Sequence, residues 1–493
     1  MKILKKTSLI VVISSSLLAL SACQPRPDAD VNASAPMASG DTSAQNSVGA
    51  SPGMVSESGV YSFMLDNGMK ILVQPDHRSP VVVSQVWYKV GGSYEYAGVT
   101  GVSHALEHMM FKGTRRLKPG EFSEIIAANG GSENAFTGKD YTAYFQRIAS
   151  DRLELCLENE ADRMRNLQLN EEEFKKEIEV IKEERRSRTD DSPTSFTYER
   201  FNAAAFINSS YQQPIIGWME DLDSMQLDDL SEWYKTWYAP NNATLVVAGD
   251  VEPQQVVQWA KKYFGPLKPS HIERLKPRRE VAQKGERRIM VKVPAKVPYL
   301  LMGYKVPVLK TVKDEWEVYA LEVLAGVLDG GNSSRLSQQL VRQDEIASSA
   351  GAGYDLYARQ ETLFLFNGVP RDGHSTVELE QAIKKQIKKI QSKVPSEQEL
   401  SRVKAQVMAS SVYEKDSVFY QAMQMGTLET VGLSWQKKDD YLQKIQQVSA
   451  AQVQAVAKKY LIDDSLTVAI LDPQPVEPAA RRKSATAGGR HGH

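Results

Sequence analysis

Apolar positions in this chain predict strands at matching places in two halves. Residues 69–74 (MKILVQ) and 81–90 (VVVSQVWYKV) are rich in β-branched side chains, which favours two neighbouring strands. A similar pair, residues 287–293 (RRIMVKV) and 299–306 (YLLMGYKV), begins about 218 residues later. The spacing therefore predicts a unit that occurs twice.

A second pair of segments supports the same repeat. Both Tyr238–Asp250 and Tyr460–Asp472 run twelve positions from Tyr to Asp, and both are typical of a helix end, a turn and a strand. A copied unit of roughly 220 residues explains these matches. Long amphipathic helices separate the strands, so the fold class predicted is α+β, with two homologous domains that each pack a mixed or antiparallel sheet against helices.

Charged and Pro-containing sequence places the domain boundaries. Residues 268–286 are poor in apolar side chains and predict an interdomain linker. The N-terminal domain is expected at 58–267 and the C-terminal domain at 287–473. Residues 23–57 and 474–493 are rich in small and polar residues or Pro, which predicts a disordered tether and a disordered tail.

The first 22 residues have the pattern of a secretory signal peptide, with early lysines, an apolar stretch and then small residues. They lead into Leu20-Ser21-Ala22-Cys23, which resembles a bacterial lipobox. That resemblance implies cleavage before Cys23 and its lipidation, so acyl chains would anchor the protein to a membrane. Gln24, where many inner-membrane lipoproteins have Asp, favours the periplasmic face of the outer membrane. The alternative is a plain signal peptide with an incidental cysteine.

Composition excludes several classes of protein. Of the 493 residues, 42% are hydrophobic and 25% charged, which is ordinary for a globular protein. The formal net charge is −1, and the sequence has no basic block of the kind that binds nucleic acid. The two cysteines, Cys23 and Cys156, exclude a disulfide framework. Cys156 lies in a predicted helix and is expected to be a buried, unreactive thiol.

Residues 104–108 (HALEH) are the strongest candidate for chemistry. On a helix, side chains four apart share a face, so His104 and His108 can bind one zinc ion. Catalytic zinc takes a third protein ligand and a water, and Glu107 is placed to accept a proton from that water as general base. The alternative is a helix with two solvent-facing histidines. The matching region of the second half, residues 319–331 (YALEVLAGVLDGG), has no histidine.

The motif H-x-x-E-H and its context resemble the pitrilysin family of inverzincin zinc metallopeptidases. The resemblance covers nearly the whole mature chain and rests on the motif, the half-length repeat and four further segments: 65–68 (LDNG), 130–145 (GGSENAFTGKDYTAYF), the charged helix 171–193 and 238–250 (YAPNNATLVVAGD). It implies half of a pitrilysin-type clamshell that binds one Zn²⁺ per chain and hydrolyses peptides.

The resemblance also implies the remaining site residues. The third zinc ligand would be Glu184, 76 positions after His108, and Glu177, seven residues earlier, would support the site from the same side of the helix. Glu183 is the competing ligand, about 100° away around the helix. Asn134 and Ala135 would contact an extended substrate at a sheet edge, although taken alone their segment is equally typical of an ordinary hairpin.

The second half departs from the family pattern. Arg342 fits the position of a substrate-binding arginine, but seven residues later, where the family has tyrosine, the chain has Ser349, and Tyr354 and Tyr357 have the wrong spacing. The resemblance therefore favours a heterodimer with a second pitrilysin-like subunit that supplies an Arg/Tyr pair; a homodimer is the alternative.

The function predicted from the sequence is a periplasmic zinc endopeptidase acting on peptides or unfolded segments. The competing hypothesis is a non-catalytic, peptide-binding scaffold subunit. The remaining histidines are assigned no role: His77, His271, His374 and, in the tail, His491 and His493.

Overall fold

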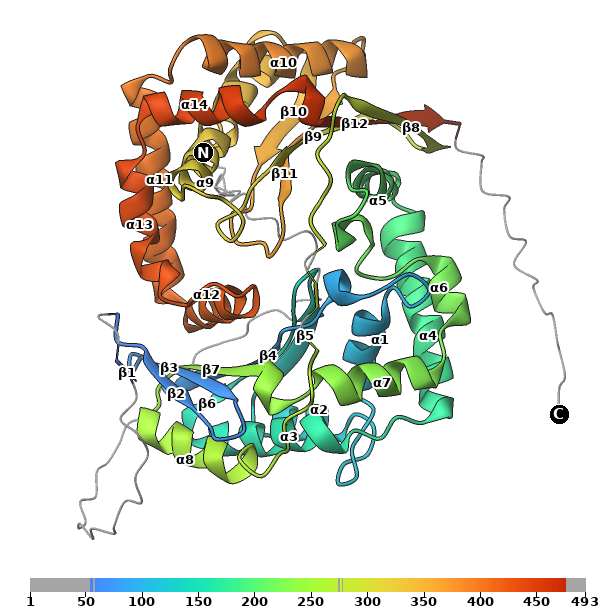
Figure 1. The fold of residues 1–493 in the computed structure, drawn as a ribbon, viewed down its shortest axis with the longest axis vertical. Helices are drawn as coiled ribbons and strands as arrows, with labels where there is room; N and C mark the ends of the chain where they lie inside the picture. The colour runs from blue at the N-terminus through green and yellow to red at the C-terminus, as the bar shows by residue number, and fades with distance from the viewer. Residues whose placement is uncertain (1–53, 56–57, 274, 277, 476–493) are drawn as a thin grey trace, which may run out of the picture.

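The computed structural model describes residues 54–55, 58–273, 275–276 and 278–475. They form two α+β halves, one above the other, each built on its own sheet (Figure 1). Within these residues no helix is long and apolar enough to cross a membrane. The predicted signal peptide, Cys23, most of the predicted tether and nearly all of the predicted tail lie outside the described residues.

The first half contains a seven-stranded mixed sheet in the order β1-β2-β3-β7-β4-β6-β5. The two strands predicted at residues 69–74 and 81–90 correspond to β3 and β4. Strand β4 lies inside the sheet with nearly all its side chains buried. Neighbouring strands are antiparallel except β3 and β7, which are parallel. The bounds are β1 Met54–Val55, β2 Tyr61–Met64, β3 Lys70–Pro75, β4 Val81–Tyr88, β5 Ser132–Thr137, β6 Thr142–Ala149 and β7 Ala243–Gly249.

Helices of the first half cover one face of this sheet and bury the larger apolar core there. The charged segment 171–193 forms a helix, α4, and a π-helical turn, η3 Arg186–Asp190. Pro193 then begins the next helix, as its fixed φ and missing N–H favour at a first helical position. The bounds are α1 Val102–Met109, α2 Glu121–Ala128, α3 Leu153–Asn166, α4 Glu171–Arg185, α5 Pro193–Ala205, α6 Met219–Ser224, α7 Leu227–Trp237 and α8 Pro253–Tyr263.

The second half repeats the topology of the first. Its five strands have the order β10-β11-β9-β12-β8, which matches β5-β6-β4-β7-β3, and β8 and β12 are parallel as β3 and β7 are. The predicted duplication is therefore confirmed. The strands are β8 Arg287–Pro294, β9 Tyr299–Val306, β10 Ala347–Gly353, β11 Thr362–Pro370 and β12 Leu466–Gln474. The helices are α9 Trp316–Asp329, α10 Thr376–Ser392, α11 Glu397–Asp416, α12 Val418–Thr430, α13 Lys437–Gln447 and α14 Ala450–Tyr460.

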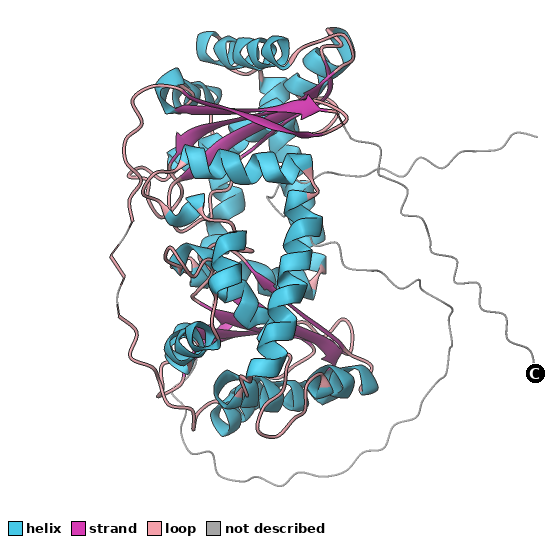
Figure 2. Ribbon diagram, turned by 90° about the vertical axis from the view of Figure 1, so that its right-hand side faces the viewer, coloured by secondary structure: helices cyan, strands magenta, loops and turns pink. Residues whose placement is uncertain are grey.

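Each half gives a helix to the sheet of the other. Helix α12 packs on β4 and β7, and α5 packs on β8 and β12, so both helices lie between the sheets (Figures 1 and 2). A Cβ on Gly426 would lie 2.0 Å from the Trp87 ring, and one on Gly303 would lie 2.7 Å from Phe201 Cζ. Only glycine fits at these two positions. Each lies in one of two apolar interfaces that join the halves.

The edges of the halves differ slightly from the predicted boundaries. Backbone pairing of Met54 and Val55 with β2 places the start of the first sheet inside the predicted tether, and β12 continues to Gln474, the first residue of the predicted tail. Within the predicted linker, residues 268–273, 275–276 and 278–286 form neither helix nor strand.

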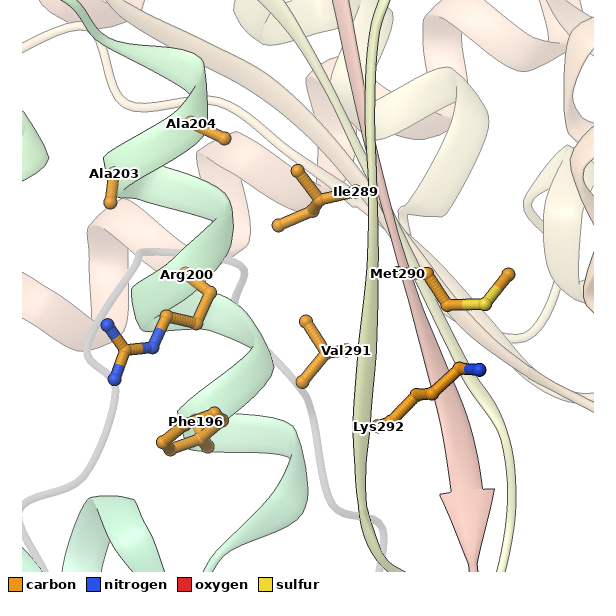
Figure 3. A pocket seen from close by; sticks show the side chains of 8 residues that line it. All are labelled: Phe196, Arg200, Ala203, Ala204, Ile289, Met290, Val291 and Lys292. Carbon is orange, nitrogen blue, oxygen red and sulfur yellow. The ribbon is translucent and has the colours of Figure 1, made fainter.

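An open pocket lies where α5 meets the edge strand β8. Phe196 and Arg200 of α5 face Ile289 and Val291 of β8 across it (Figure 3). The pocket lies on different elements from the histidine motif, which is on α1.

Candidate metal centre

A buried carboxylate holds the N-terminus of α1, the helix that carries His104, Glu107 and His108. Glu95 accepts hydrogen bonds from the backbone N–H groups of Gly101 and Ser103, at 2.8 and 2.9 Å. The first amides of a helix have no partner within it, and negative charge is favoured at that end. Burial raises the pKa of Glu95 to about 7. The apolar face of α1 then packs into the core through Val102, Ala105, Leu106 and Met109.

Helix α4 brings Glu184 to both histidines. Its Oε2 lies 3.7 Å from His104 Nε2 and 3.5 Å from His108 Nε2. The two imidazole rings are 4.7 Å apart, centre to centre. Among the described residues, these three side chains are the group of His, Cys, Asp or Glu placed closely enough to hold a metal ion.

Neighbouring charges orient two of the three candidate ligands. Glu177 Oε2 lies 3.2 Å from His108 Nδ1, and its Oε1 pairs with Lys112 Nζ at 2.6 Å. Arg188, in the π-helical turn, pairs with Glu184 Oε1 at 2.5 Å. His108 Nε2 and Glu184 Oε2 are thereby left facing the shared centre.

Glu183, the competing ligand, points away from this cluster. Its carboxylate pairs with Arg186 at 3.0 Å, and its side chain is 73% exposed, compared with 16% for Glu184. The angular offset between successive helical residues is the physical reason for the difference.

Glu107 lies beside the ligand cluster on α1 and accepts a hydrogen bond from the Thr137 hydroxyl at the end of β5. Burial raises the pKa of Glu107 to about 7, and the Thr137 hydrogen bond opposes the rise. A carboxylate with a pKa near neutrality can both accept and return a proton, as a general base requires.

The pKa values of the candidate ligands, set by protein groups alone, shift in different directions. Burial and the neighbouring His108 lower the pKa of His104 to about 4, so this imidazole is neutral and keeps a lone pair. Burial disfavours the charged form of His108, but hydrogen bonds to Glu177 and Glu184 outweigh it and raise its pKa to about 9. Burial also disfavours the charged form of Glu184, but His108 and His104 outweigh it and the pKa is lowered.

The segment predicted as an exposed sheet edge is β5, the outermost strand beside β6. Asn134 is exposed, and its Oδ1 accepts a hydrogen bond from the backbone N–H of Ala135 at 2.8 Å. The Ala135 side chain is buried. Because Thr137 ends the same strand, the open edge leads to Glu107.

The second half brings no tyrosine to the predicted position. Arg342 is exposed and, within the part of the chain that the structure describes, forms no ion pair; Ser349 is exposed on β10. Tyr354 is buried, and its hydroxyl donates to Pro307 O at 2.6 Å. Tyr357 packs against Tyr441 within the same half.

Cys156, His77 and His374 are not part of the metal-binding group. Cys156 is fully buried, as predicted, and burial raises the pKa of its thiol to about 12. His77 pairs with Asp250 at 2.7 Å, and His374 lies 3.5 Å from Glu378, both away from the cluster.

Sequence reasoning missed four residues that shape the site. Lys112 and Arg188 lie four positions after His108 and Glu184, so helical spacing was an available signal. Glu95 lies six residues before Gly101, so an acidic residue shortly before the helix was also an available signal, whereas Thr137 reaches Glu107 across 30 positions through tertiary packing.

Comparison with known proteins places the chain in a family. Residues 70–218 match the model described as Insulinase (Peptidase family M16), and residues 224–407 match Peptidase M16 inactive domain. Zinc protease PqqE of Helicobacter pylori is 32% identical over 84% of this chain and 92% of its own length. The chain belongs to peptidase family M16, the insulinase or pitrilysin-like family, which confirms the resemblance.

Solved structures agree on the fold. The crystal structure of a protease from Helicobacter pylori matches 84% of this chain and 99% of its own, with 32% identity and a TM-score of 0.79. The periplasmic protease PqqL from Escherichia coli matches 87% of this chain but 49% of its own, at 17% identity and a TM-score of 0.71. The two-domain fold thus corresponds to half of that longer chain, as the clamshell prediction requires. The metal cluster lies within the match to the insulinase model.

Proposed function

We propose that this chain is a zinc-dependent endopeptidase that hydrolyses peptides or unfolded polypeptide segments. The observation that carries the proposal is the convergence of His104 Nε2, His108 Nε2 and Glu184 Oε2, with Glu107 beside them. Names of relatives support zinc and proteolysis for the family.

The donor set fits zinc. Two imidazole nitrogens and one carboxylate oxygen are a known catalytic zinc set, with metal–ligand bonds of about 2.0–2.2 Å. Tetrahedral ligands at that bond length are about 3.3–3.6 Å apart, and the structure has 3.5 and 3.7 Å between Glu184 and the histidines. We propose one zinc ion per chain, held by His104, His108 and Glu184.

Each group at the site would have a separate role in peptide hydrolysis. When bound, zinc would supply Lewis-acid chemistry, lowering the pKa of a water and polarising a peptide carbonyl. Glu107 would accept the proton of the attacking water and deliver it to the leaving amine. Thr137 would hold the Glu107 carboxylate in position, while Glu177 orients the His108 ring.

An extended peptide would bind by adding to the open edge of β5. A substrate carbonyl could replace the Asn134 side chain as the acceptor of the Ala135 N–H. Main-chain pairing there would bring the scissile bond towards Glu107, which suits extended or unfolded substrates because folded ones have no free strand. Arg342 remains a proposed substrate contact.

The second candidate function is a non-catalytic scaffold subunit. The absence of a tyrosine at position 349 and the match of residues 224–407 to a domain described as inactive favour it. Against it, the complete ligand set and base lie in the other half. The second half is instead consistent with a partner subunit that supplies the missing Arg/Tyr pair.

The test is Glu107→Gln, which keeps the shape of the side chain and removes the proton acceptor. We expect it to bind zinc as the parent does and to lose casein-peptide hydrolysis by at least about 100-fold, the lower end of the range for removal of a general base. Glu183→Gln, on the exposed side of α4, is the matched control and should keep parental activity. Parental activity in Glu107→Gln would overturn the mechanism.

Localisation and partner are separate proposals. We propose lipidation of Cys23 and anchoring at the periplasmic face of the outer membrane. Cys23→Ser should move the protein from the membrane fraction to the soluble fraction, and an unchanged distribution would refute the anchor.

The proposed heterodimer is tested by co-purification from the native host. Peptide hydrolysis is then measured with and without the recovered partner, and full activity of the lone chain would refute the heterodimer.

A further inference from the structure

An arginine of the second half inserts into the first half. Arg359 lies between β10 and β11, and its Nε donates to Asp140 Oδ1 at 3.1 Å. Its Nη2 donates to Ser93 Oγ at 2.7 Å and to Ser93 O at 3.3 Å. The guanidinium also lies 4.1 Å from the centre of the Tyr94 ring. Every one of these contacts is with the other half.

The acceptor, Asp140, is 4% exposed and has its hydrogen bonds satisfied from both halves. It accepts from Ser93 Oγ at 2.6 Å, from the Tyr211 hydroxyl, and from the backbone N–H of Arg359 at 3.0 Å. A buried carboxylate is costly without a partner, and the planar guanidinium spans Asp140 and Ser93 together, which an ammonium cannot do. The contact is therefore specific for arginine.

Asp140 connects this contact to Glu107 through one short turn. It lies in the turn between β5 and β6, where the Gly138 N–H donates to Tyr141 O at 2.8 Å. Thr137, three residues before Asp140, donates to Glu107. A shift of the turn would therefore move the hydroxyl that holds the base.

Ser93 connects the same contact to α1. The Ser93 N–H donates to Lys139 O at 2.6 Å, so the segment before α1 is tied to the β5–β6 turn. Two residues later, Glu95 binds the first amides of α1. Arg359 thus contacts the two segments that carry Thr137 and Glu95, which support Glu107 and α1.

We propose that Arg359 is a positioning residue: through Asp140 and Ser93 it lets the second half set the geometry of Glu107 and α1. This role rests on the proposed peptidase function. It makes the second half necessary to the site even though that half has no tyrosine at position 349.

Kinetics give the first test, with Arg359→Ala, Arg359→Lys and the control Arg371→Ala, which removes an exposed ion pair with Glu345 in the same half. A misplacement of about 1 Å can cost about 100-fold, so we expect Arg359→Ala to lower kcat by about 10- to 100-fold with KM and zinc content near parental. Arg359→Lys should be intermediate, and Arg371→Ala unchanged. A parental kcat in Arg359→Ala overturns the proposal.

Amide hydrogen exchange of the zinc-free proteins gives the second test, which needs no activity. We expect Arg359→Ala to exchange faster than parent in residues 92–103 and 133–142 and unchanged in β12; if that variant does not fold, Arg359→Lys should show the same pattern. Parental exchange in both segments overturns the positioning role. Failure of the parent to cleave any peptide, alone and together with a partner recovered from the native host, would instead refute the proposed function, and the exchange result would still decide the role of Arg359.

Discussion

Glu177 and His108 form the contact that orients the site: Glu177 Oε2 lies 3.2 Å from His108 Nδ1. The hydrogen bond turns Nε2 of the same ring towards Glu184. A carboxylate behind a metal-binding imidazole fixes its tautomer and raises its basicity.

Removing the charge of Glu177 should weaken zinc binding without removing a ligand. We expect Glu177→Gln to lower zinc affinity by about 10- to 100-fold, because the acceptor behind the His108 ring loses its negative charge. Competition with a chromophoric chelator measures it. Glu172→Gln, on the same helix with an 80% exposed side chain, is the control and should bind as the parent does. Equal affinities for the two variants would contradict the supporting role.

Zinc binding should release a proton at pH 7.5. The pKa of His108 in the metal-free site is about 9, so its imidazole carries a proton that the metal must displace. Calorimetric titrations in buffers of different ionisation enthalpy should give about one proton released per zinc bound. The release should decline as the pH rises above 9, where His108 is already neutral. A heat independent of the buffer at pH 7.5 would contradict this protonation state.

Peptide hydrolysis should decline on the acid side of neutrality. Glu107 acts as a base only when ionised, and burial raises its pKa to about 7 in the metal-free site. A bound cation would lower that value, so the acid limb of kcat/KM should lie at or below pH 7, falling about tenfold per pH unit. Zinc content measured at each pH separates this loss from loss of metal. A flat profile down to pH 5 with zinc retained would contradict the role of Glu107.

The interface between α12 and the first sheet should be intolerant of side chains at Gly426. A valine there would overlap the Trp87 ring, and its slightly better helix propensity than glycine is too small to offset the overlap. We expect Gly426→Val to lower the free energy of unfolding by about 2 kcal/mol or more, from overpacking. Gly353→Val is the control, because a Cβ there meets nothing within 4 Å, and it should change stability by less than about 0.5 kcal/mol. Equal melting temperatures would contradict the tight interface.

The duplication and the strand pairs could be predicted because each is local. The two Tyr-to-Asp segments carry their helix, turn and strand in consecutive residues, and the structure places β7 and β12 at equivalent positions. The choice of Glu184 over Glu183 also follows from local geometry, since successive helical residues point in different directions.

The exchanged helices and the Arg359 contact could not be predicted in this way. Gly426 packs against Trp87, more than 300 positions earlier in the sequence, and Arg359 contacts Asp140, 219 positions earlier. Neither pair leaves a periodic signal, because both depend on how the halves pack. Composition also placed Met54–Val55 in the tether and Gln474 in the tail, although all three residues pair with strands. Backbone pairing, rather than composition, decides where a sheet ends.

Titration of the metal-free protein with zinc, following peptide hydrolysis, tests the central claim most directly. Activity should rise linearly and reach its plateau at about one zinc per chain, as three protein ligands and one site require. Glu107→Gln should bind the same equivalent and stay inactive, and Glu184→Ala should reach no plateau at that ratio. Retention of less than about a tenth of a zinc per parent chain, or hydrolysis unaffected by its removal, would contradict the account.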